Sequence, residues 1–512
     1  MKLDRSSMLY GTLLLTATGL CSQVLGFLYR IALSRLIGAE LMGLYQLILP
    51  VYSVLSSLTV VGLTVAVSTL SAEYHAKNDP GAIRQVRRTC LRCFFLLLAP
   101  LAVLAALLSD PISVYILGDA RTRLGLLLLL PCLLLTGVEN LQKHAFFGVG
   151  NVRPPAFAEL AEQLIRAAAV LGLLVVFLPQ NPERTVGLIT LGMVLCEVFS
   201  AVTLTVLFRR WMGGGPMGTL PSGALRRRIF KIASPVGLTA LLGNLMASAC
   251  AVLIPQKLVA GGATVREAMS AFGVLSGMTL PLLALPSALI GALGLVLVPK
   301  LAESVALGDQ KTVSRRMNRV LLGTSVLILP AMALLVVVGP GMGQLLFHEP
   351  TVGEHCLPLA VCMALACYQS VLSCALNGIG KQSWAAKNAI LSGGVQLLFT
   401  VFTVEKWGLS GYVAGCLAST VLGLTLNWID VRRATGLRLR LFSWFVAPGL
   451  AAVLMGLNCN LLFQVLQERG VTMTPAVLVC LAFGTGFYLL ALAAQGVHPL
   501  RPVVALLRGA PL

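Results

Sequence analysis

Residues 43–76 read GLYQLILPVYSVLSSLTVVGLTVAVSTLSAEYHA, and residues 273–306 read GVLSGMTLPLLALPSALIGALGLVLVPKLAESVA. The second stretch aligns with the first at a constant offset of 230 residues, and the register continues beyond it without a gap. Matches of Leu or Ala carry little information in so apolar a chain, whereas Gly, Glu, Asp and Cys are scarcer. The aligned scarce residues are Gly43 with Gly273, Glu73 with Glu303, Asp79 with Asp309, Cys132 with Cys362, Gly148 with Gly378 and Gly150 with Gly380. These matches indicate a tandem repeat.

The composition excludes a soluble globular protein. Of the 512 residues, 57% are hydrophobic and only 11% are charged, against about 25% charged in soluble domains. Apolar stretches of about 20 residues recur, each long enough to cross about 30 Å of hydrocarbon as a helix. The sequence therefore predicts an all-α polytopic membrane protein with about 14 transmembrane helices. The predicted spans are 9–36, 42–72, 93–110, 122–146, 156–178, 186–208, 233–255, 268–299, 320–340, 356–377, 385–404, 409–429, 443–466 and 474–495.

The repeat offset covers six spans, an even number, so both copies enter the membrane in the same direction. We therefore expect two six-helix lobes related by a pseudo-two-fold axis along the membrane normal. Tandem membrane copies place a substrate path between them near the midplane, which indicates a transporter. The predicted divisions are an N-lobe at 1–208, a basic linker at 209–232, a C-lobe at 233–430, and two extra helices with a tail at 431–512.

Lys and Arg concentrate in the N-terminus, in the loops that follow the even-numbered spans, and in the C-terminal tail. This bias predicts that both termini are cytoplasmic. We also expect residues 1–7 to precede a retained span rather than to begin a cleaved signal peptide. The net charge of +19 is spread over these loops, so we expect anionic membrane lipids and no nucleic acid as partners. The polar stretches 73–92 and 303–319 are predicted as interfacial helices.

Residues 26–40, GFLYRIALSRLIGAE, lead into Gly43-Leu44-Tyr45, and Trp407-Gly408-Leu409 opens span 12. With the paired GxG turns, these segments resemble the multidrug/oligosaccharidyl-lipid/polysaccharide exporter superfamily, most closely its stage V sporulation protein B branch. The resemblance implies a V-shaped, two-lobe helical fold in a bacterial cytoplasmic membrane. It also implies that lipid-linked glycans or amphiphiles move by alternating access.

Residues 22–27, SQVLGF, are also similar to the first span of the lipid II flippase branch. That branch has arginines where this chain has Gln23 and Tyr29, and the arginine here is Arg30. The resemblance therefore does not carry the arginine-lined phosphate site of that branch over to this chain.

Ionisable and polar residues inside the spans are the candidates for a site, because burying them in lipid is costly. Arg30 either binds phosphate or forms an internal ion pair, for example with Glu162. The polar face of span 2 suits sugar hydroxyls, although the same residue types also join packed helices. The predicted substrate-binding residues are Arg30, Gln23, Gln46, Ser53, Ser56 and Asn244.

A second set of residues suits coupling or gating. Glu162 and Arg166 are spaced to pair along span 5, and Glu197 is an isolated acid in span 6. Glu139 lies in span 4, and Gln369 is its repeat partner. These side chains either hold helices of the first lobe together or exchange H⁺ or Na⁺.

Enzyme chemistry is not indicated. The five histidines form no HExxH pair, and the chain has no Walker loop, so we expect no catalytic residue, metal or cofactor. The predicted function is a monomeric flippase or exporter of a lipid-linked oligosaccharide or peptidoglycan precursor. The alternatives are cation-coupled drug efflux on the same fold and a non-transporting cell-wall scaffold.

Overall fold

The computed structural model describes residues 8–177, 181–213, 215, 218–307, 309–436 and 442–495. All regular elements in these ranges are helical, and thirteen helices are long and apolar enough to cross a membrane. The predicted class, an all-α polytopic membrane protein, is confirmed. Residues 1–7 and the tail after residue 495 lie outside the described ranges.

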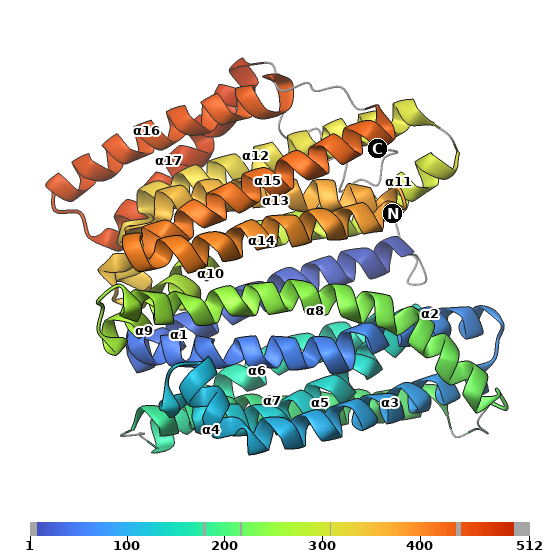
Figure 1. Ribbon diagram of the computed structural model, residues 1–512. Helices are drawn as coiled ribbons and strands as arrows, with labels where there is room; N and C mark the ends of the chain where they lie inside the picture. Colours follow the sequence, from blue (N-terminus) through green and yellow to red (C-terminus); the bar gives the residue numbers. More distant parts are fainter. Residues whose placement is uncertain are drawn as a thin grey trace. The chain divides into compact units, whose positions relative to one another are not determined.

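Packing divides the chain into two compact units, residues 1–273 and 274–512 (Figure 1). The first contains α1 (Met8–Ser56), η1 (Ser57–Val61), α2 (Gly62–Ala76), α3 (Pro80–Leu107), α4 (Ser109–Pro111), η2 (Ile112–Ile116), η3 (Ala120–Thr122), α5 (Arg123–Gly148), α6 (Arg153–Phe177), α7 (Pro182–Met212), α8 (Ser222–Ala260) and α9 (Val265–Gly273). The second contains η4 (Val274–Thr279), α10 (Leu280–Ala284), α11 (Ser287–Ala306), α12 (Gln310–Met342), η5 (Gly343–Phe347), η6 (Pro350–Gly353), α13 (Cys356–Gly378), α14 (Gln382–Trp407), α15 (Leu409–Thr435), η7 (Phe442–Val446), α16 (Ala447–Glu468) and α17 (Met473–Ala494). Packing thus groups α8 and α9 with the first six predicted spans, and the lobe boundaries drawn from the repeat stay a prediction.

Span 8 differs from the helices observed, whereas spans 1 and 2 are confirmed as separate helices. They are the two parts of α1, which meet at a kink where Gly38 leaves the helical conformation with φ 76° and ψ 178°. Span 8 is interrupted between α9 and α11 by a π-helical turn and the short α10. Pro281 and Pro286 lie in this interruption, and each lacks the N–H that would continue a helix.

The repeat is visible in local structure. The Asp79 carboxylate accepts from the Ala82 N–H at the start of α3 (2.8 Å), and Asp309 accepts from the Thr312 N–H at the start of α12 (3.0 Å). These caps also correct the prediction of interfacial helices at 73–92 and 303–319. Each stretch is the end of one helix, a turn, and the start of the next, because the capping aspartate begins a new helix.

Gly43 and Gly273, which the repeat aligns, contact each other where α1 and α9 cross. A Cβ atom at Gly43 would lie 2.1 Å from the Met269 carbonyl oxygen, and one at Gly273 would lie 2.0 Å from that of Ala39. Ala39 and Met269 are again 230 residues apart. The contact is therefore reciprocal, as a two-fold relation between the repeated segments would produce, and it leaves no room for a side chain.

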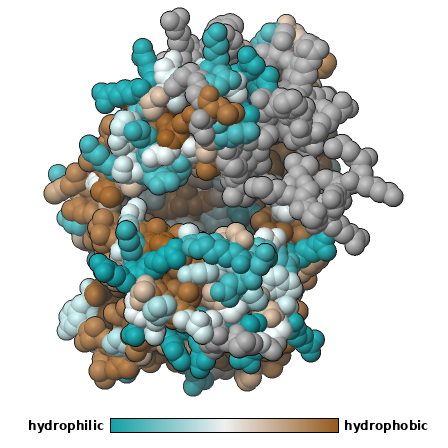
Figure 2. All heavy atoms as spheres, turned by 90° about the vertical axis from the view of Figure 1, so that its right-hand side faces the viewer, coloured by the Kyte–Doolittle hydropathy of each residue, from teal (hydrophilic) through white to brown (hydrophobic). Residues whose placement is uncertain are grey.

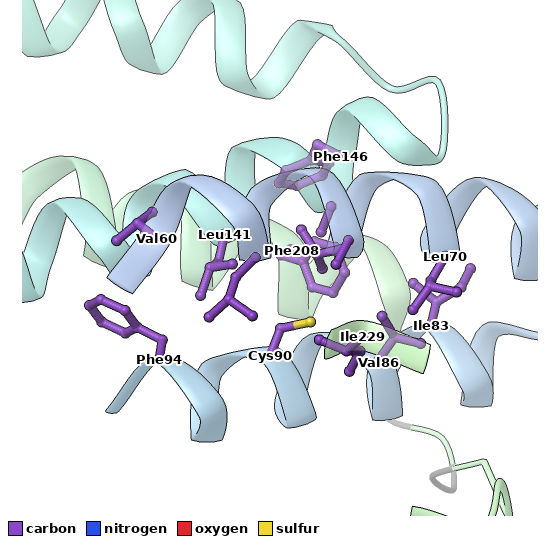
Figure 3. Close-up of a cluster of buried hydrophobic side chains, with 14 of the residues drawn as sticks. Val60, Leu70, Ile83, Val86, Cys90, Phe94, Leu141, Phe146, Phe208 and Ile229 are labelled. Carbon is purple, nitrogen blue, oxygen red and sulfur yellow. The ribbon is translucent and has the colours of Figure 1, made fainter. Parts of the chain in front are cut away.

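The core of the first unit lies where α2, α3, α5, α7 and α8 meet. Phe94, Phe146 and Phe208 are fully buried there, with Cys90 and Ile229 beside them (Figure 3). The end of the molecule that faces the viewer in Figure 2 is where α2 turns into α3, and hydrophilic side chains gather there. Hydrophobic side chains gather at the lower left of this view, as expected for a surface that contacts lipid.

Candidate functional site

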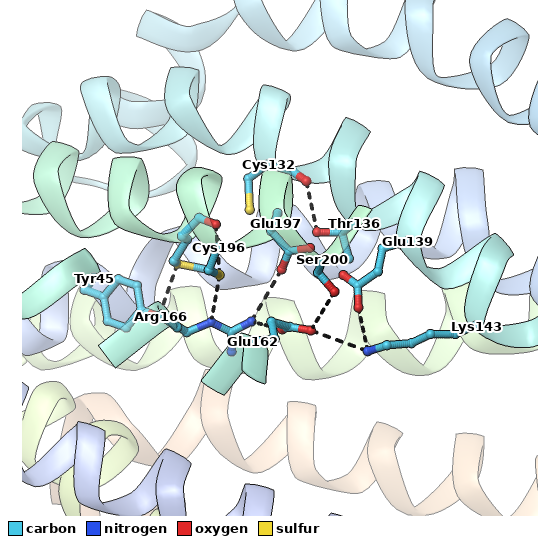
Figure 4. A network of polar contacts seen from close by, with 11 residues as sticks. Tyr45, Cys132, Thr136, Glu139, Lys143, Glu162, Arg166, Cys196, Glu197 and Ser200 are labelled. Carbon is cyan, nitrogen blue, oxygen red and sulfur yellow. Dashed lines mark hydrogen bonds and ion pairs between the residues drawn. The ribbon is translucent and has the colours of Figure 1, made fainter. Parts of the chain in front are cut away.

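Three helices of the first unit bring a group of charged side chains together. Lys143 of α5 lies 2.6 Å from the Glu139 carboxylate and 3.5 Å from that of Glu162 of α6 (Nζ to Oε). Arg166 pairs with Glu162 one turn earlier, and its Nη2 lies 3.4 Å from Oε1 of Glu197 on α7. Figure 4 shows these five side chains, the buried charged cluster, pointing toward one another between the helices.

The buried charged cluster has unequal numbers of acids and bases. Its carboxylates are almost inaccessible, with 2% of Glu139, 6% of Glu162 and 4% of Glu197 exposed. Three acids face two cations, so full ionisation leaves one uncompensated negative charge inside a membrane-spanning segment. Such a charge is costly in a low-dielectric interior. The arrangement favours one bound proton or one additional cation.

Two neutral groups complete the surroundings of these charges. The Ser200 hydroxyl donates to Glu162 (3.4 Å), and Arg166 Nε donates to the Cys196 sulfur (3.5 Å). Glu197 Oε2 is buried and has no hydrogen-bond partner in the described part of the chain. Glu139 Oε1 also lacks a hydrogen bond there but lies 2.6 Å from Lys143 Nζ. Glu197 is therefore the acid of the cluster that is better placed to hold a proton.

Glu162, Cys196 and Glu197 have ligand atoms within 4.8 Å of one another, which raises the question of a metal. The Arg166 guanidinium bonds to Glu162 and Cys196 and lies close to Glu197. It already supplies the positive charge that a metal ion would supply. The donor set therefore does not fit a metal well.

The equivalent positions of the second repeat carry no charge. Glu139, Lys143, Glu162 and Arg166 align with Gln369, Ser373, Ser392 and Gln396. Amide and hydroxyl groups join the helices of that unit instead. Asn427 Nδ2 donates to the Gln369 carbonyl (3.2 Å), and Ser419 donates to Gln396 Oε1 (3.2 Å). Because neutral residues suffice for helix packing there, packing alone does not account for the charges of the first unit.

The observed contacts confirm one prediction about the coupling residues and correct another. The Glu162–Arg166 pair is confirmed, whereas the description of Glu197 as isolated is wrong, because α7 carries it into the cluster. Sequence reasoning missed Lys143. The available signal was the Glu139–Lys143 spacing of four within an apolar span, which places both side chains on one helix face.

Arg30 lies on the first half of α1 and is half-buried. It forms no hydrogen bond or ion pair with any residue in the described ranges, so the alternative pairing with Glu162 is wrong. Gln23, seven residues earlier, lies on the same helix face. A Cβ at Gly26, between them, would lie 3.7 Å from Gln163 Oε1 of α6. An unpaired cation thus shares a polar face with two amides.

Two of the other predicted substrate-binding residues form hydrogen bonds within the helices. Asn244 of α8 donates to the Ser57 hydroxyl (2.6 Å), and Ser53 donates to the Leu49 carbonyl of its own helix (3.1 Å). Asn244 therefore joins α8 to the π-helical turn, as the helix-packing interpretation expects. Gln46 is 8% exposed, and its Nε2 has no partner within the described ranges. Ser56 is half-buried.

Two curated proteins of Bacillus subtilis (strain 168) are similar to this chain over most of their length. Stage V sporulation protein B is 25% identical, and the match covers 85% of this chain and 86% of that protein. Lipid II flippase MurJ is 23% identical, and the match covers 94% of each chain.

Two solved structures share the fold. Lipid II flippase MurJ in an inward closed conformation has a TM-score of 0.69 at 12% identity, and the match covers 94% of this chain and 98% of that one. An inward-facing multidrug resistance MATE family transporter of the MOP superfamily has a TM-score of 0.64 at 15% identity, covering 81% of this chain and 96% of that one. At these identities the likeness concerns the fold alone.

Two family models match the sequence itself. The model for lipid II flippase MurJ matches residues 273–481. The model for polysaccharide biosynthesis proteins matches residues 8–305, more than half of the chain. The chain therefore belongs to the polysaccharide biosynthesis protein family.

Proposed function

We propose that this protein is a flippase that moves a lipid-linked oligosaccharide or peptidoglycan precursor across the bacterial cytoplasmic membrane by alternating access. The negatively charged headgroup passes through the protein while the lipid tail stays in the bilayer. Similarity to stage V sporulation protein B and lipid II flippase MurJ supports this substrate class. The lobe divisions given above and the cytoplasmic position of both termini are part of the proposal, as is a monomeric state.

The observation that carries the proposal is Arg30. A half-buried arginine without a partner is costly in a membrane protein and marks a functional site. Its planar guanidinium suits the oxygens of a pyrophosphate. Gln23 on the same face and Gln163 across from it supply further donors. Gln46 and Ser56 remain candidates for sugar contacts.

We assign coupling to the buried charged cluster. With one bound proton the cluster is neutral, and without it the cluster carries one negative charge. Glu197 is the acid that we assign the proton to, because its Oε2 has no hydrogen-bond partner among the described residues and the unbonded Glu139 oxygen lies beside Lys143. Taking up and releasing that proton from opposite sides of the membrane would drive transport. Arg166 and Lys143 keep the remaining charges paired. Na⁺ in place of the proton is the alternative that the ion dependence of transport tests.

The experiment uses purified protein in liposomes that contain a fluorescent polyprenyl-pyrophosphate-linked sugar. A membrane-impermeant reagent, added outside, reports how much label has reached the outer leaflet. Protein-dependent movement under an imposed pH gradient or potential supports the proposal. Protein with Arg30→Ala serves as the inactive comparison.

Cation-coupled drug efflux is the second candidate, and its support is the structural likeness to a MATE family transporter. An unpaired arginine on the polar face of α1 fits an anionic headgroup better than a cationic drug. A resistance assay in a pump-deficient strain separates the two. Increased drug tolerance together with an inactive flippase assay would favour efflux.

A further inference from the structure

Two pockets of the second unit adjoin at Trp444. The cationic pocket has a volume of about 560 Å³ and is lined by Lys311, Ser314, Arg315, Asn318 and Arg319 of α12, with Trp444. The apolar pocket has a volume of about 290 Å³ and is lined by Leu321, Leu365, Leu372 and Leu424, again with Trp444. A charged pocket that adjoins an apolar one is the shape that an amphiphile requires.

Within the described ranges, the positive charges of the cationic pocket contact no acidic side chain. Lys311, Arg315 and Arg319 follow each other at intervals of four, which places them on one face of α12. None of the three forms an ion pair with a residue in the described part of the chain. Asp309 is an electrostatic neighbour of Arg315, but its carboxylate already accepts from the Thr312 N–H and hydroxyl. The pocket therefore attracts an anion.

Trp444 is held in place at the junction, with one polar atom unsatisfied. The Ser325 hydroxyl donates to its carbonyl and lies 2.6 Å from the Tyr368 hydroxyl. The rings of Tyr368 and Trp428 lie 6.4 Å and 6.2 Å from its ring. Trp444 is 7% exposed, and Nε1 has no hydrogen-bond acceptor among the residues described. A buried indole N–H without an acceptor is costly, so an oxygen of a bound molecule would satisfy it.

We propose that the two pockets together bind one anionic glycerophospholipid. Its phosphate lies among Lys311, Arg315 and Arg319, an ester oxygen accepts from the Trp444 indole, and an acyl chain fills the apolar pocket. The cationic pocket opens at the start of α12, on the predicted cytoplasmic side, where basic pockets between membrane helices bind lipid headgroups. Free phosphate would leave the apolar pocket unused, and a neutral lipid would leave three cations unpaired.

The proposal concerns a bilayer lipid, not the transported molecule, whose site we assign to Arg30 in the first unit. A lipid at this position would fix η7 and α16 against α12 and make the protein depend on the anionic lipid content of its membrane. Binding can be measured without transport. Failure of this proposal therefore leaves the proposed transport untouched, and failure of transport leaves this proposal untouched.

The test compares phosphatidylglycerol with phosphatidylcholine of the same acyl chains, bound to the full-length protein and titrated by native mass spectrometry. Wild-type protein should retain one tightly bound phosphatidylglycerol. Losing two cations should weaken its binding about 25-fold in Arg315→Gln/Arg319→Gln, about fivefold for each. The matched control is Arg226→Gln/Arg227→Gln, which removes equal charge from the exposed start of α8 and should leave this binding unchanged.

A second measurement locates the lipid. Phosphatidylglycerol brominated on its acyl chain should quench tryptophan fluorescence, and Trp428→Phe/Trp444→Phe, which removes both tryptophans of the apolar pocket, should remove most of the difference from brominated phosphatidylcholine. Equal binding of the two lipids, or unchanged binding in Arg315→Gln/Arg319→Gln, overturns the proposal. Displacement of the bound lipid by one equivalent of polyprenyl pyrophosphate overturns it in favour of a substrate site. Displacement by millimolar inorganic phosphate alone reduces it to a simple anion site.

Discussion

At the scale of single residues, the first unit contains two arginines with opposite surroundings. Arg166 is held by Glu162 and Cys196 and lies near Glu197. Arg30 has no such partner in the described chain and shares a face with Gln23. A paired arginine neutralises buried acids, whereas an unpaired one is available to a ligand. Substituting each should therefore give a different result.

Arg30→Ala should abolish transport while the protein still inserts and folds, because no buried acid loses its partner. Arg30→Lys should keep part of the activity, since lysine retains the charge but loses the bidentate geometry. Membrane-inserted protein and flipping rate are measured for both variants. Full transport by Arg30→Ala would contradict the proposed role.

Arg166→Ala should instead lower the amount of folded protein, because three acids would then face Lys143 alone. Breaking a buried ion pair costs about 3–5 kcal/mol, so we expect little inserted protein. A second change, Glu162→Gln, should restore folding by removing the stranded charge. Normal expression of Arg166→Ala alone would show that the cluster is less tightly coupled than its distances indicate.

Glu197→Gln should fold at least as well as the wild type, because the cluster then has two acids and two cations. Transport driven by a pH gradient should be lost, since no carboxyl group remains to exchange the proton. Flipping rates under an imposed gradient are compared with those of Glu183→Gln, a matched change at the exposed start of α7. Unchanged gradient-driven transport would remove Glu197 from the coupling mechanism.

At the scale of helices, α1 and α9 approach each other closely at Gly43 and Gly273. Each glycine faces a carbonyl oxygen of the other helix, so a methyl group on either one must push the helices apart. The contact ties together segments that the repeat makes equivalent. Its tightness can be tested by the smallest possible side chain.

Gly43→Ala and Gly273→Ala should each lower the stability of the purified protein by about 1–3 kcal/mol, the usual cost of overpacking. Gly172→Ala in α6 is the matched control, because a Cβ there would meet no atom within 4 Å. Alanine is also the better helix former, so this control should be neutral or stabilising. The thermal unfolding midpoints of the three purified variants are compared with that of the wild type in detergent. Unchanged midpoints for Gly43→Ala and Gly273→Ala would show that the helix crossing tolerates a methyl group.

Much of this helical structure could be predicted from the sequence, for identifiable reasons. Apolar length predicted the spans, and the repeat predicted that Asp79 and Asp309 are equivalent positions. The helix break at Gly38 lies in the gap predicted between spans 1 and 2. The π-helical turn that interrupts span 8 could not be predicted, because it leaves no break in the apolar pattern. That Glu197 joins Glu139 and Lys143 could not be predicted either, since it depends on how α5 and α7 face each other.

At the scale of the whole molecule, the chain combines a fold shared with transporters of different substrates and a charge pattern of its own. The fold alone does not select between lipid and drug substrates. The selection rests on Arg30 in the first unit and on similarity to polysaccharide biosynthesis proteins and to lipid II flippase MurJ. The coupling cluster, by contrast, would serve either substrate.

The most direct test of the proposed flippase activity is the movement of a labelled polyprenyl-pyrophosphate-linked sugar between leaflets of liposomes that contain the purified protein. Label placed on the inner leaflet should reach the outer leaflet in a protein-dependent way, and Arg30→Ala should stop this movement. If the label stays on its starting leaflet with and without an imposed ion gradient or membrane potential, the protein is not a flippase for this class of lipid.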